Sequence, residues 1–573
     1  MKKHHRLCAL LPAAALVLAS LSACGSPSGS SASAVASSAA DSAAASISDT
    51  APASAAPAAS TTDVSDPDSA VELSSDIELP LTTEDVDVSI WISVNPNAYN
   101  YMEKGMASNE TYNELQARTG IGFDWVACTP DNSAESFMLS IASQDYYDIY
   151  VDGNSQFNGG SDAAVEQEVF IDLADKIHEF CPNLENLLDA DPSAKVAAMT
   201  DSGILVGAPQ FFNKPRGLTH GFVARQDWLE EFGNTNLETY DDWHDYLTFI
   251  RDNHDGASFL LASSGCCMNG YLIGGYGVIG NIETNMGFSM PFFQEDGQVK
   301  FGPIEDGYLE YLKMVRQWYS EGLIYKDFVS QWNPFEPDMG LITGGELGIF
   351  MTDQWNIDSY DASMEDGGSW VAIQDPTKEA GDSLHFGDEM LTVNPIFWCI
   401  STACEHPELV LQMFNYTYSD EGSLLMNYGV EGLTYEIGSD GLPHYTDFIT
   451  DSGISLDFSL YCHVTTNAPY VLDVERSYEA YSQKEIDAVG IWATDVDSAN
   501  VLPANISMTA DESSRYSAIA NDIATTISEN VLAIIVGDKD ISDYEALRQQ
   551  IKDMGIDTCI EIYQTAYDRY LQR

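Results

Sequence analysis

A long segment near the N-terminus limits which part of this chain can fold. Residues 25–78 consist mostly of Ser, Ala, Pro, Thr and Asp. Such a segment buries too little apolar surface to offset the entropy that ordering costs, so we predict that it is disordered. A flexible coil of about 55 residues spans roughly 40 Å, which suits a tether. We therefore expect the folded part to begin near residue 81.

The residues before this segment have the layout of an export signal. Lys2, Lys3 and Arg6 precede an apolar run that is too short to span a bilayer. Residues 21–24 read LSAC, which resembles the lipobox of bacterial lipoproteins. This resemblance implies cleavage before Cys24 and acylation of its thiol, and several acyl chains form a stable anchor. The alternative is an ordinary cleavage site with an incidental cysteine. We expect a signal peptide over 1–23 and a lipidated Cys24 with its linker over 24–80.

The charge of the chain excludes some partners. It has 24 Lys and Arg against 89 Asp and Glu, a formal net charge of −65. A field of this sign repels nucleic-acid phosphates and anionic lipid headgroups, and it disfavours a polyanionic ligand. The acids are spread along the chain, as on a solvated surface. A hydrophobic content of 45% with 11% aromatic residues indicates that the part after the linker is globular.

The chain lacks the common catalytic and metal-binding signatures. It contains no G-x-S-x-G, no H-E-x-x-H and no C-x-x-C sequence. Gly275, Gly277 and Gly280 form a G-x-G-x-x-G pattern, but the residues after it do not resemble a helix, so we interpret it as a loop. The cysteines are sparse, and a disulfide between Cys399 and Cys404 is left open. We expect no enzyme activity, no cofactor and no metal.

The folded part begins with an alternating pattern of strands and helices. Apolar residues at every second position of 86–94 predict a strand. Asn109 as N-cap and Gly120 as terminator predict a helix between them. Strands are predicted at 121–126 and 146–151, with a helix at 135–144 between them. Strand–helix–strand units at this spacing predict a parallel sheet with right-handed crossovers.

Later helices are predicted from apolar stripes. The stripe in residues 308–319 consists of Tyr308, Tyr311, Leu312, Val315 and Trp318. A second stripe consists of Ile519, Ile523, Ile527 and Val531. Residues 542–545 read SDYE and predict a capping box, with Gly555 as the end of the helix that follows. These elements predict an α/β protein with more than one lobe.

An ordered set of motifs resembles a known family. SIWIS, ELQARTGI and SIASQDYYDIYV are followed by GILVGAPQ, VARQDWLEEFG, YSEGLIYKDF, GGELGIF, HPELVLQMFNYTYSDEG and NYGVEGLTYE. Together with the C-terminal MGID and YQTAYDRY, they resemble extracellular solute-binding proteins (family 1) of sugar-importing ABC transporters. The resemblance is to the LipO-like lipoprotein subgroup. It implies a two-lobe, periplasmic-binding-protein-like (type II) flytrap with hinge crossovers over 81–573. Lobe 1 would take about 84–210 and 395–450, and lobe 2 about 211–394 and 451–573.

The resemblance also implies a ligand site between the lobes. A tryptophan stacks on the apolar face of a sugar ring, while amide and carboxylate groups bond its hydroxyls. A tryptophan in a loop is also common as simple packing. The residues that the resemblance assigns to the site are Trp355, Tyr271, Asn95, Tyr99, Asp152, Asn154 and Gln210.

Two departures from the family pattern affect the expected ligand. Many members carry an acidic calcium loop where this chain has RDNHDGASF, which lacks the regular acids, so we predict no calcium there. Maltodextrin binders stack a tryptophan at the position of Asp152, which argues against maltodextrin.

The resemblance implies a receptor rather than an enzyme. We expect a monomer that is lipid-anchored to the cell membrane, faces the extracellular side, captures a carbohydrate and delivers it to ABC permease subunits. An oligosaccharide is the expected ligand, and no nucleic acid is expected as a partner. The alternatives are a receptor for a peptide or another non-sugar solute, and a surface glycosidase.

Overall fold

A computed structural model gives the fold of the part after the linker. It describes residue 73 and residues 77–216, 219–254, 258–259, 270–279, 282–284, 287–330, 338–387, 391–465, 467–478, 481–503 and 506–573. By their contacts, Ser69–Arg573 form one compact unit. The predicted signal peptide, Cys24 and most of the predicted linker lie outside the described residues.

The first sheet has six strands. Their spatial order is β17 (Val471–Leu472), β5 (Ala208–Arg216), β14 (Leu391–Ile400), β4 (Ile149–Val151), β1 (Val86–Ser93) and β3 (Ile121–Cys128). Strand β1 pairs in parallel with β3 and β4, whereas β14 runs antiparallel to β4 and β5. The carboxyl ends of β1, β3 and β4 therefore lie at one edge of this sheet.

The first predicted elements are confirmed. Val88, Ile90 and Ile92 of β1 are buried, as the alternating pattern predicted. Helix α2 (Glu110–Thr119) begins at Asn109, whose side chain accepts a hydrogen bond from Tyr112 N. It ends at Gly120, which has a φ of 78°, a conformation that glycine adopts without strain.

Helices and short strands surround the first sheet. The helices are α1 (Pro96–Tyr99), α3 (Pro130–Ser143), α4 (Gly153–Gln156), α5 (Gly160–Glu166), α6 (Ile177–Phe180), α7 (Pro182–Ala190), α8 (Pro192–Ala198), α15 (Pro407–Tyr418), α16 (Asp420–Tyr428), α17 (Asp447–Thr450) and α18 (Leu456–His463). The short strands are β2 (Glu103–Met106) and the antiparallel pair β15 (Tyr435–Ile437) and β16 (Pro443–Tyr445).

The second sheet has four strands. Their order is β13 (Trp370–Ala372), β6 (His220–Arg225), β12 (Leu347–Asp353) and β7 (Ser258–Phe259). Two antiparallel pairs lie outside it, β8 (Ile282–Thr284) with β9 (Gly287–Ser289) and β10 (Phe292–Glu295) with β11 (Gln298–Phe301). The α-helices of this part are α9 (Gln226–Phe232), α10 (Tyr240–Asn253), α11 (Gly270–Ile273), α12 (Asp306–Ser320), α13 (Met339–Thr343), α14 (Ile357–Ser363), α19 (Gln483–Trp492), α20 (Ala510–Val536), α21 (Tyr544–Asp553) and α22 (Ile556–Tyr570).

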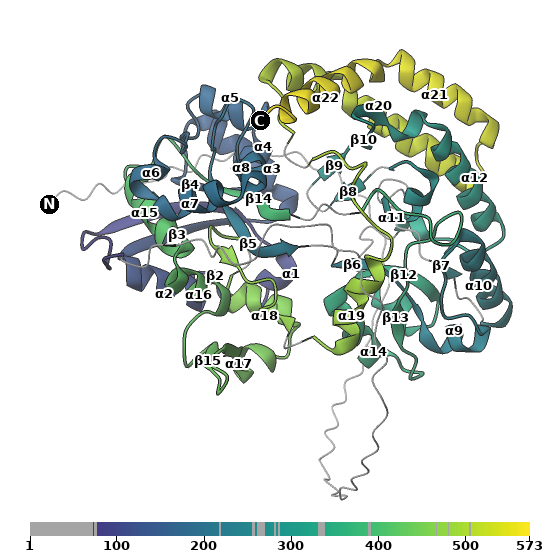
Figure 1. The fold of residues 1–573 in the computed structure, drawn as a ribbon, viewed down its shortest axis with the longest axis horizontal. Coiled ribbons are helices and arrows are strands. Elements are labelled where there is room, and N and C mark those ends of the chain that lie inside the picture. Colours follow the sequence, from purple (N-terminus) through teal and green to yellow (C-terminus); the bar gives the residue numbers. More distant parts are fainter. Residues whose placement is uncertain are drawn as a thin grey trace, which may run out of the picture. The chain divides into compact units, whose positions relative to one another are not determined.

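The C-terminal helices pack on the second core. Figure 1 shows α20, α21 and α22 at the yellow end of the colour scale; α20 packs against α12, α21 and α22. The predicted stripe of α12 is buried along its length. By length and composition α20 could span a membrane. However, its stripe residues Ile523, Ile527 and Val531 belong to the second core, so α20 packs as a core helix of a globular protein does.

The chain passes three times between two separate hydrophobic cores. The first core includes residues from Val88 to Phe211 and from Val393 to Leu472. The second includes residues from Phe222 to Phe386 and from Ala488 to Tyr567. We had placed the third crossing near residue 450. Because Cys462, Ala468, Tyr470 and Leu472 belong to the first core, we propose that lobe 1 continues to about residue 473.

Candidate functional site

A cavity of about 320 Å³ lies at the carboxyl end of β1, between residues of the first core and Trp355. Loops at the carboxyl ends of parallel strands commonly hold ligands in open α/β sheets. The segments around the first core supply the end of β1 and residues of α18, and the turn after β12 supplies Trp355. The lining residues are Ile92, Ser93, Asn95, Met106, Tyr112, Val151, Trp355, Asp457, Tyr461, Thr465 and Asn467.

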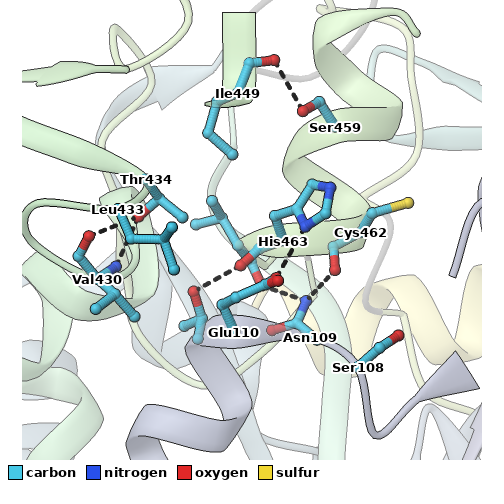
Figure 2. Close-up of polar contacts among 12 residues, drawn as sticks. Ser108, Asn109, Glu110, Val430, Leu433, Thr434, Ile449, Ser459, Cys462 and His463 are labelled. Carbon is cyan, nitrogen blue, oxygen red and sulfur yellow. Dashed lines mark hydrogen bonds and ion pairs between the residues drawn. The ribbon is translucent and has the colours of Figure 1, made fainter. Parts of the chain in front are cut away.

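The start of α2 holds helix α18, which carries the lining residue Tyr461, through polar contacts that Figure 2 shows. The buried Asn109 side chain donates hydrogen bonds to the carbonyls of Cys462 at 3.0 Å and Val464 at 2.8 Å. Next to it, Glu110 pairs with His463 at 2.8 Å. One asparagine therefore caps α2 and also fixes the end of α18, the helix that carries the lining residue Tyr461.

Hydroxyl groups form part of the cavity wall. The Tyr461 hydroxyl accepts a hydrogen bond of 3.1 Å from Asn95 N, and the Tyr112 hydroxyl lies 2.9 Å from Thr465 Oγ1. Burial raises the pKa of Tyr461 to about 12, so its hydroxyl stays protonated near neutral pH. Such neutral hydroxyls can both donate to and accept from the hydroxyls of a ligand.

Trp355 reaches the cavity from the turn after β12. Its side chain is half-buried, and the backbone N of the preceding Gln354 donates to the carbonyl of Thr219 at 2.9 Å. Gln354 Nε2 and Asn356 Nδ2 are buried and have no hydrogen-bond partner among the described residues. Buried polar groups normally have partners, so these two amide donors call for an explanation, although neither Gln354 nor Asn356 lines the cavity.

Gln210, on the crossing strand β5, does not line this cavity. It is buried, and its Oε1 accepts a hydrogen bond of 3.2 Å from Asn394 Nδ2. Asn394 also lies 3.4 Å from Asn467 Oδ1, and the Asn467 carbonyl accepts a hydrogen bond from Trp398 Nε1. Gln210 is therefore linked to the lining residue Asn467 through one side chain.

A larger cavity of about 690 Å³ lies next to the first one along the sheet. Val151 lines the smaller cavity and the next residue, Asp152, lines the larger one, so both open at the carboxyl end of β4. The larger cavity is lined from the first part of the chain by residues of α4, α5 and the end of α8. From the C-terminal part it is lined by residues 506–508, by α20 and by α22.

Asp152 has an unusual backbone. Its φ is 57° and its ψ is 28°, a left-handed conformation that costs energy for a residue with a side chain. Its backbone N donates a hydrogen bond of 2.7 Å to the carbonyl of Phe397 on β14, and Ser155 Oγ donates to its carboxylate at 2.7 Å. Burial raises the pKa of Asp152 to about 6, although the Ser155 hydrogen bond opposes this shift. Strained residues with shifted pKa values concentrate at functional sites.

The structure separates the predicted site residues into groups. Asn95 and Trp355 line the smaller cavity, and Asp152 and Asn154 line the larger one. Tyr99, whose side chain is among those described, lines neither cavity; its hydroxyl lies close to the backbone of Gly105. Tyr271 belongs to α11, but its side chain lies outside the described residues. The ligand-binding role of these residues stays a prediction.

Several lining residues were not predicted. Asp457, Tyr461 and Thr465 lie in a segment that we had assigned to the other lobe. Tyr516 and Tyr563 line the larger cavity from helices that looked like simple packing elements. No local signal marks these positions, because contacts across hundreds of residues bring them to the cavities.

The described residues contain no group of three or more His, Cys, Asp or Glu side chains arranged to hold a metal. The six cysteines that the structure describes are all free thiols, including Cys399 and Cys404. The hydroxyls of Ser93, Tyr112, Tyr461 and Thr465, the amides of Asn95 and Asn467 and the carboxylate of Asp457, beside Trp355, make up the polar groups of the smaller cavity.

Comparisons with known proteins give a curated relative and solved structures of similar fold. No family model matches the chain. A curated relative, the fructooligosaccharide ABC transporter substrate-binding protein FusA of Streptococcus pneumoniae, is 28% identical over 237 residues. The match covers 39% of this chain and 42% of the relative, so the chain spans less than half the length of that relative.

Solved structures match over a longer part of the chain. The alginate-binding protein AlgQ2 has a TM-score of 0.68 and 19% identity, covering 85% of this chain and 99% of its own. An EF-hand mutant of the S. pneumoniae protein FusA, in complex with fructo-nystose, has a TM-score of 0.66 and 18% identity, covering 85% and 99%. The predicted α/β, two-lobe fold of solute-binding proteins is therefore confirmed, as is the predicted resemblance to them.

Proposed function

We propose that this chain is a receptor that captures an oligosaccharide outside the cell and delivers it to an ABC importer. The observation that carries the proposal is the meeting of Trp355, from the turn after β12, with Asn95 and Tyr461, from the segments around the first core, in one cavity. An aromatic face beside amides and hydroxyls suits a sugar ring. Ligand contacts from both lobes favour the closed state, which is how a flytrap receptor responds to its ligand.

The relatives support this proposal and argue against an enzyme. FusA is named as a substrate-binding protein for fructooligosaccharides, and AlgQ2 as an alginate-binding protein. A binding protein needs no chemistry at its site. A micromolar sugar receptor needs only about −8 kcal/mol of binding free energy, which stacking and several hydroxyl contacts can supply.

We further propose that Cys24 carries the lipid that holds the receptor at the membrane. The layout of residues 1–24 supports this assignment, and a flexible linker lets the receptor reach its ligand. Metabolic labelling with a fatty acid tests it: the full chain should take up label, and Cys24→Ala should lose both the label and membrane association. Label on the Cys24→Ala chain would contradict the assignment.

The receptor proposal is tested with a panel of ligands. A ligand that binds the native state raises the melting temperature, so we expect stabilisation by one or more oligosaccharides and not by peptides. Calorimetry should then give a dissociation constant, and incubation should release no new reducing ends. Stabilisation by peptides alone, or turnover of a glycan, would contradict the proposal.

A further inference from the structure

We propose that the larger cavity is a second part of the ligand site, that it accepts uncharged sugar residues, and that Asp152 and Asp162 exclude acidic ones. This inference rests on the proposed function and names its ligand class. It concerns the cavity of about 690 Å³ between α4, α5 and the C-terminal helices, a volume within the range of small-molecule sites.

The first argument is the charge of the cavity wall. Asp152 and Asp162 line it, and none of the described lining residues is Lys, Arg or His. Arg569 and Arg573 contact the lining residue Ser507. However, Arg569 is paired with Asp201 at 2.8 Å and with Glu512 at 2.6 Å, while Arg573 is paired with Asp201. A ligand carboxylate would therefore lose its water without gaining a free cation, which is unfavourable.

Among residues 217–505, the segments that the structure does not describe add no cation to this wall. The segments outside the description between residues 217 and 505 contain no Lys, Arg or His. Arg216, whose side chain is also outside it, pairs with Leu391 on β14, whereas the lining residue Phe397 pairs with Pro209. Seven positions along a strand correspond to roughly 20 Å, so the backbone of Arg216 is remote from this wall.

The second argument is an acceptor that has no donor. Asp162 Oδ2 accepts a hydrogen bond of 2.8 Å from Ser202 Oγ. Asp162 Oδ1 is buried and has no hydrogen-bond partner among the described residues. A buried acceptor without a donor is costly, and a sugar hydroxyl would supply the donor. A ligand carboxylate has no proton to give near neutral pH.

The third argument is the apolar part of the wall. Phe157 and Phe397 line the cavity from the first core, and Tyr516 and Tyr563 line it from α20 and α22. The two tyrosine rings lie 5.5 Å apart in an edge-to-face arrangement. Such rings offer surfaces to the C–H face of a sugar, while the carboxylates take its hydroxyls. The combination fits a neutral glycan better than an anionic one.

The inference is tested on the full chain with matched sugars. The neutral probes are fructo-oligosaccharides. Each sugar is compared with an acid, in which its primary hydroxyls are oxidised to carboxylates, and with an amide, in which those carboxylates are converted to neutral amides. Calorimetry at neutral pH should show that the acid binds at least about tenfold more weakly than the parent sugar, and that the amide recovers most of the affinity.

The salt dependence of sugar binding distinguishes repulsion by the carboxylates in the cavity from repulsion by the net charge of the protein. At about 0.5 M salt the Debye length is about 4 Å, so long-range repulsion by the acidic surface is screened. Discrimination by desolvated carboxylates in the cavity should persist at this salt concentration. If it vanished there, the surface and not the cavity would be responsible, and the inference would be overturned.

Variants give the complementary test. The double variant Asp152→Asn/Asp162→Asn should reduce the discrimination from about tenfold to about threefold or less. The control Asp124→Asn/Asp131→Asn changes two exposed carboxylates, and hence the net charge by the same amount, and should leave the discrimination intact. Equal binding of acid and parent sugar by the wild type would overturn the inference while leaving the receptor proposal standing. If no glycan bound at all, the receptor proposal itself would fail.

Discussion

Arg573 Nε donates a hydrogen bond of 2.6 Å to Asp201 Oδ1, and so joins the end of the chain to the turn after α8. Helix α22, which precedes Arg573, packs in the second core, and α8 packs in the first. Arg569 Nε donates to the other oxygen of Asp201 at 2.8 Å, and Arg573 Nη1 donates to the carbonyl of Met199 at 2.7 Å. One carboxylate therefore connects elements of both cores beside the larger cavity.

We predict that Asp201→Asn destabilises the protein. The change leaves two arginines without a shared carboxylate in a place where Arg573 and Asp201 are only 8% and 11% exposed. The expected loss is about 1–3 kcal/mol of unfolding free energy, measured by urea denaturation. Asp189→Asn is the control, because Asp189 forms an exposed pair with Lys195, and it should change stability by less than about 0.5 kcal/mol. Equal effects of the two variants would contradict a structural role for Asp201.

Trp355→Ala should weaken binding of the oligosaccharide found in the ligand panel. Loss of a stacked ring is expected to cost about 1.4 kcal/mol or more, which corresponds to at least about tenfold in the dissociation constant. Trp355→Phe should retain part of the affinity, because it keeps an aromatic face. Tyr478→Ala removes an exposed ring that lines neither cavity and serves as the control. A dissociation constant that stays the same in calorimetry would remove Trp355 from the site.

The sequence predicted those parts of the fold that depend on neighbouring residues. Asn109 and Gly120 bracket α2 as expected, because capping involves groups within one turn of the chain. The prediction of a capping box at 542–545 was wrong. The N-cap is Asp540, whose side chain accepts a hydrogen bond from Ser542 N and whose backbone N donates to the side chain of Asp543. Several acids close together offer competing caps, and the spacing alone does not decide between them.

The cavities were less predictable than the elements around them. The resemblance suggested Trp355 and Asp152, which the structure does place on cavity walls, although their roles are untested. The resemblance did not indicate Tyr461 or Asp162. Tyr461 reaches the smaller cavity because Asn109 holds α18, a contact across more than three hundred residues. Local patterns do not encode such contacts.

Asn109→Ala should therefore affect both stability and binding. The change removes the acceptor for Tyr112 N and the donor to the carbonyls of Cys462 and Val464, all in a buried place. We expect a loss of about 2–4 kcal/mol of unfolding free energy. We also expect weaker ligand binding, since α18 carries Tyr461. The control is Asn113→Ala, an exposed position on α2, which should be near neutral. Normal affinity in a destabilised Asn109→Ala would show that α18 does not depend on this contact.

The raised pKa of Asp152 predicts a pH-dependent ligand preference. Asp152 has a pKa of about 6 in the folded protein against an ordinary value of 3.8. Between pH 3.8 and 6, Asp152 therefore carries a proton in the folded protein but not in the unfolded chain. Ionisation of Asp152 therefore lowers the free energy of unfolding above pH 6, and the protein gains stability as the pH falls through 6. Protonation also removes one of the two negative charges that line the larger cavity.

We expect the discrimination against acidic sugars to decrease between about pH 7.5 and about pH 5, measured as the ratio of dissociation constants. The groups that face Asp152 do not reverse this sign. Ser155 and Asn154 do not titrate, the carboxylate of Asp162 lies in the same cavity and adds to the repulsion, and burial raises the pKa of the Cys399 thiol, which stays neutral. Asp152→Asn should make the ratio much less dependent on pH, whereas Asp124→Asn should not. A wild-type ratio that is constant over this range would show that the charge of Asp152 plays no part in the choice of ligand.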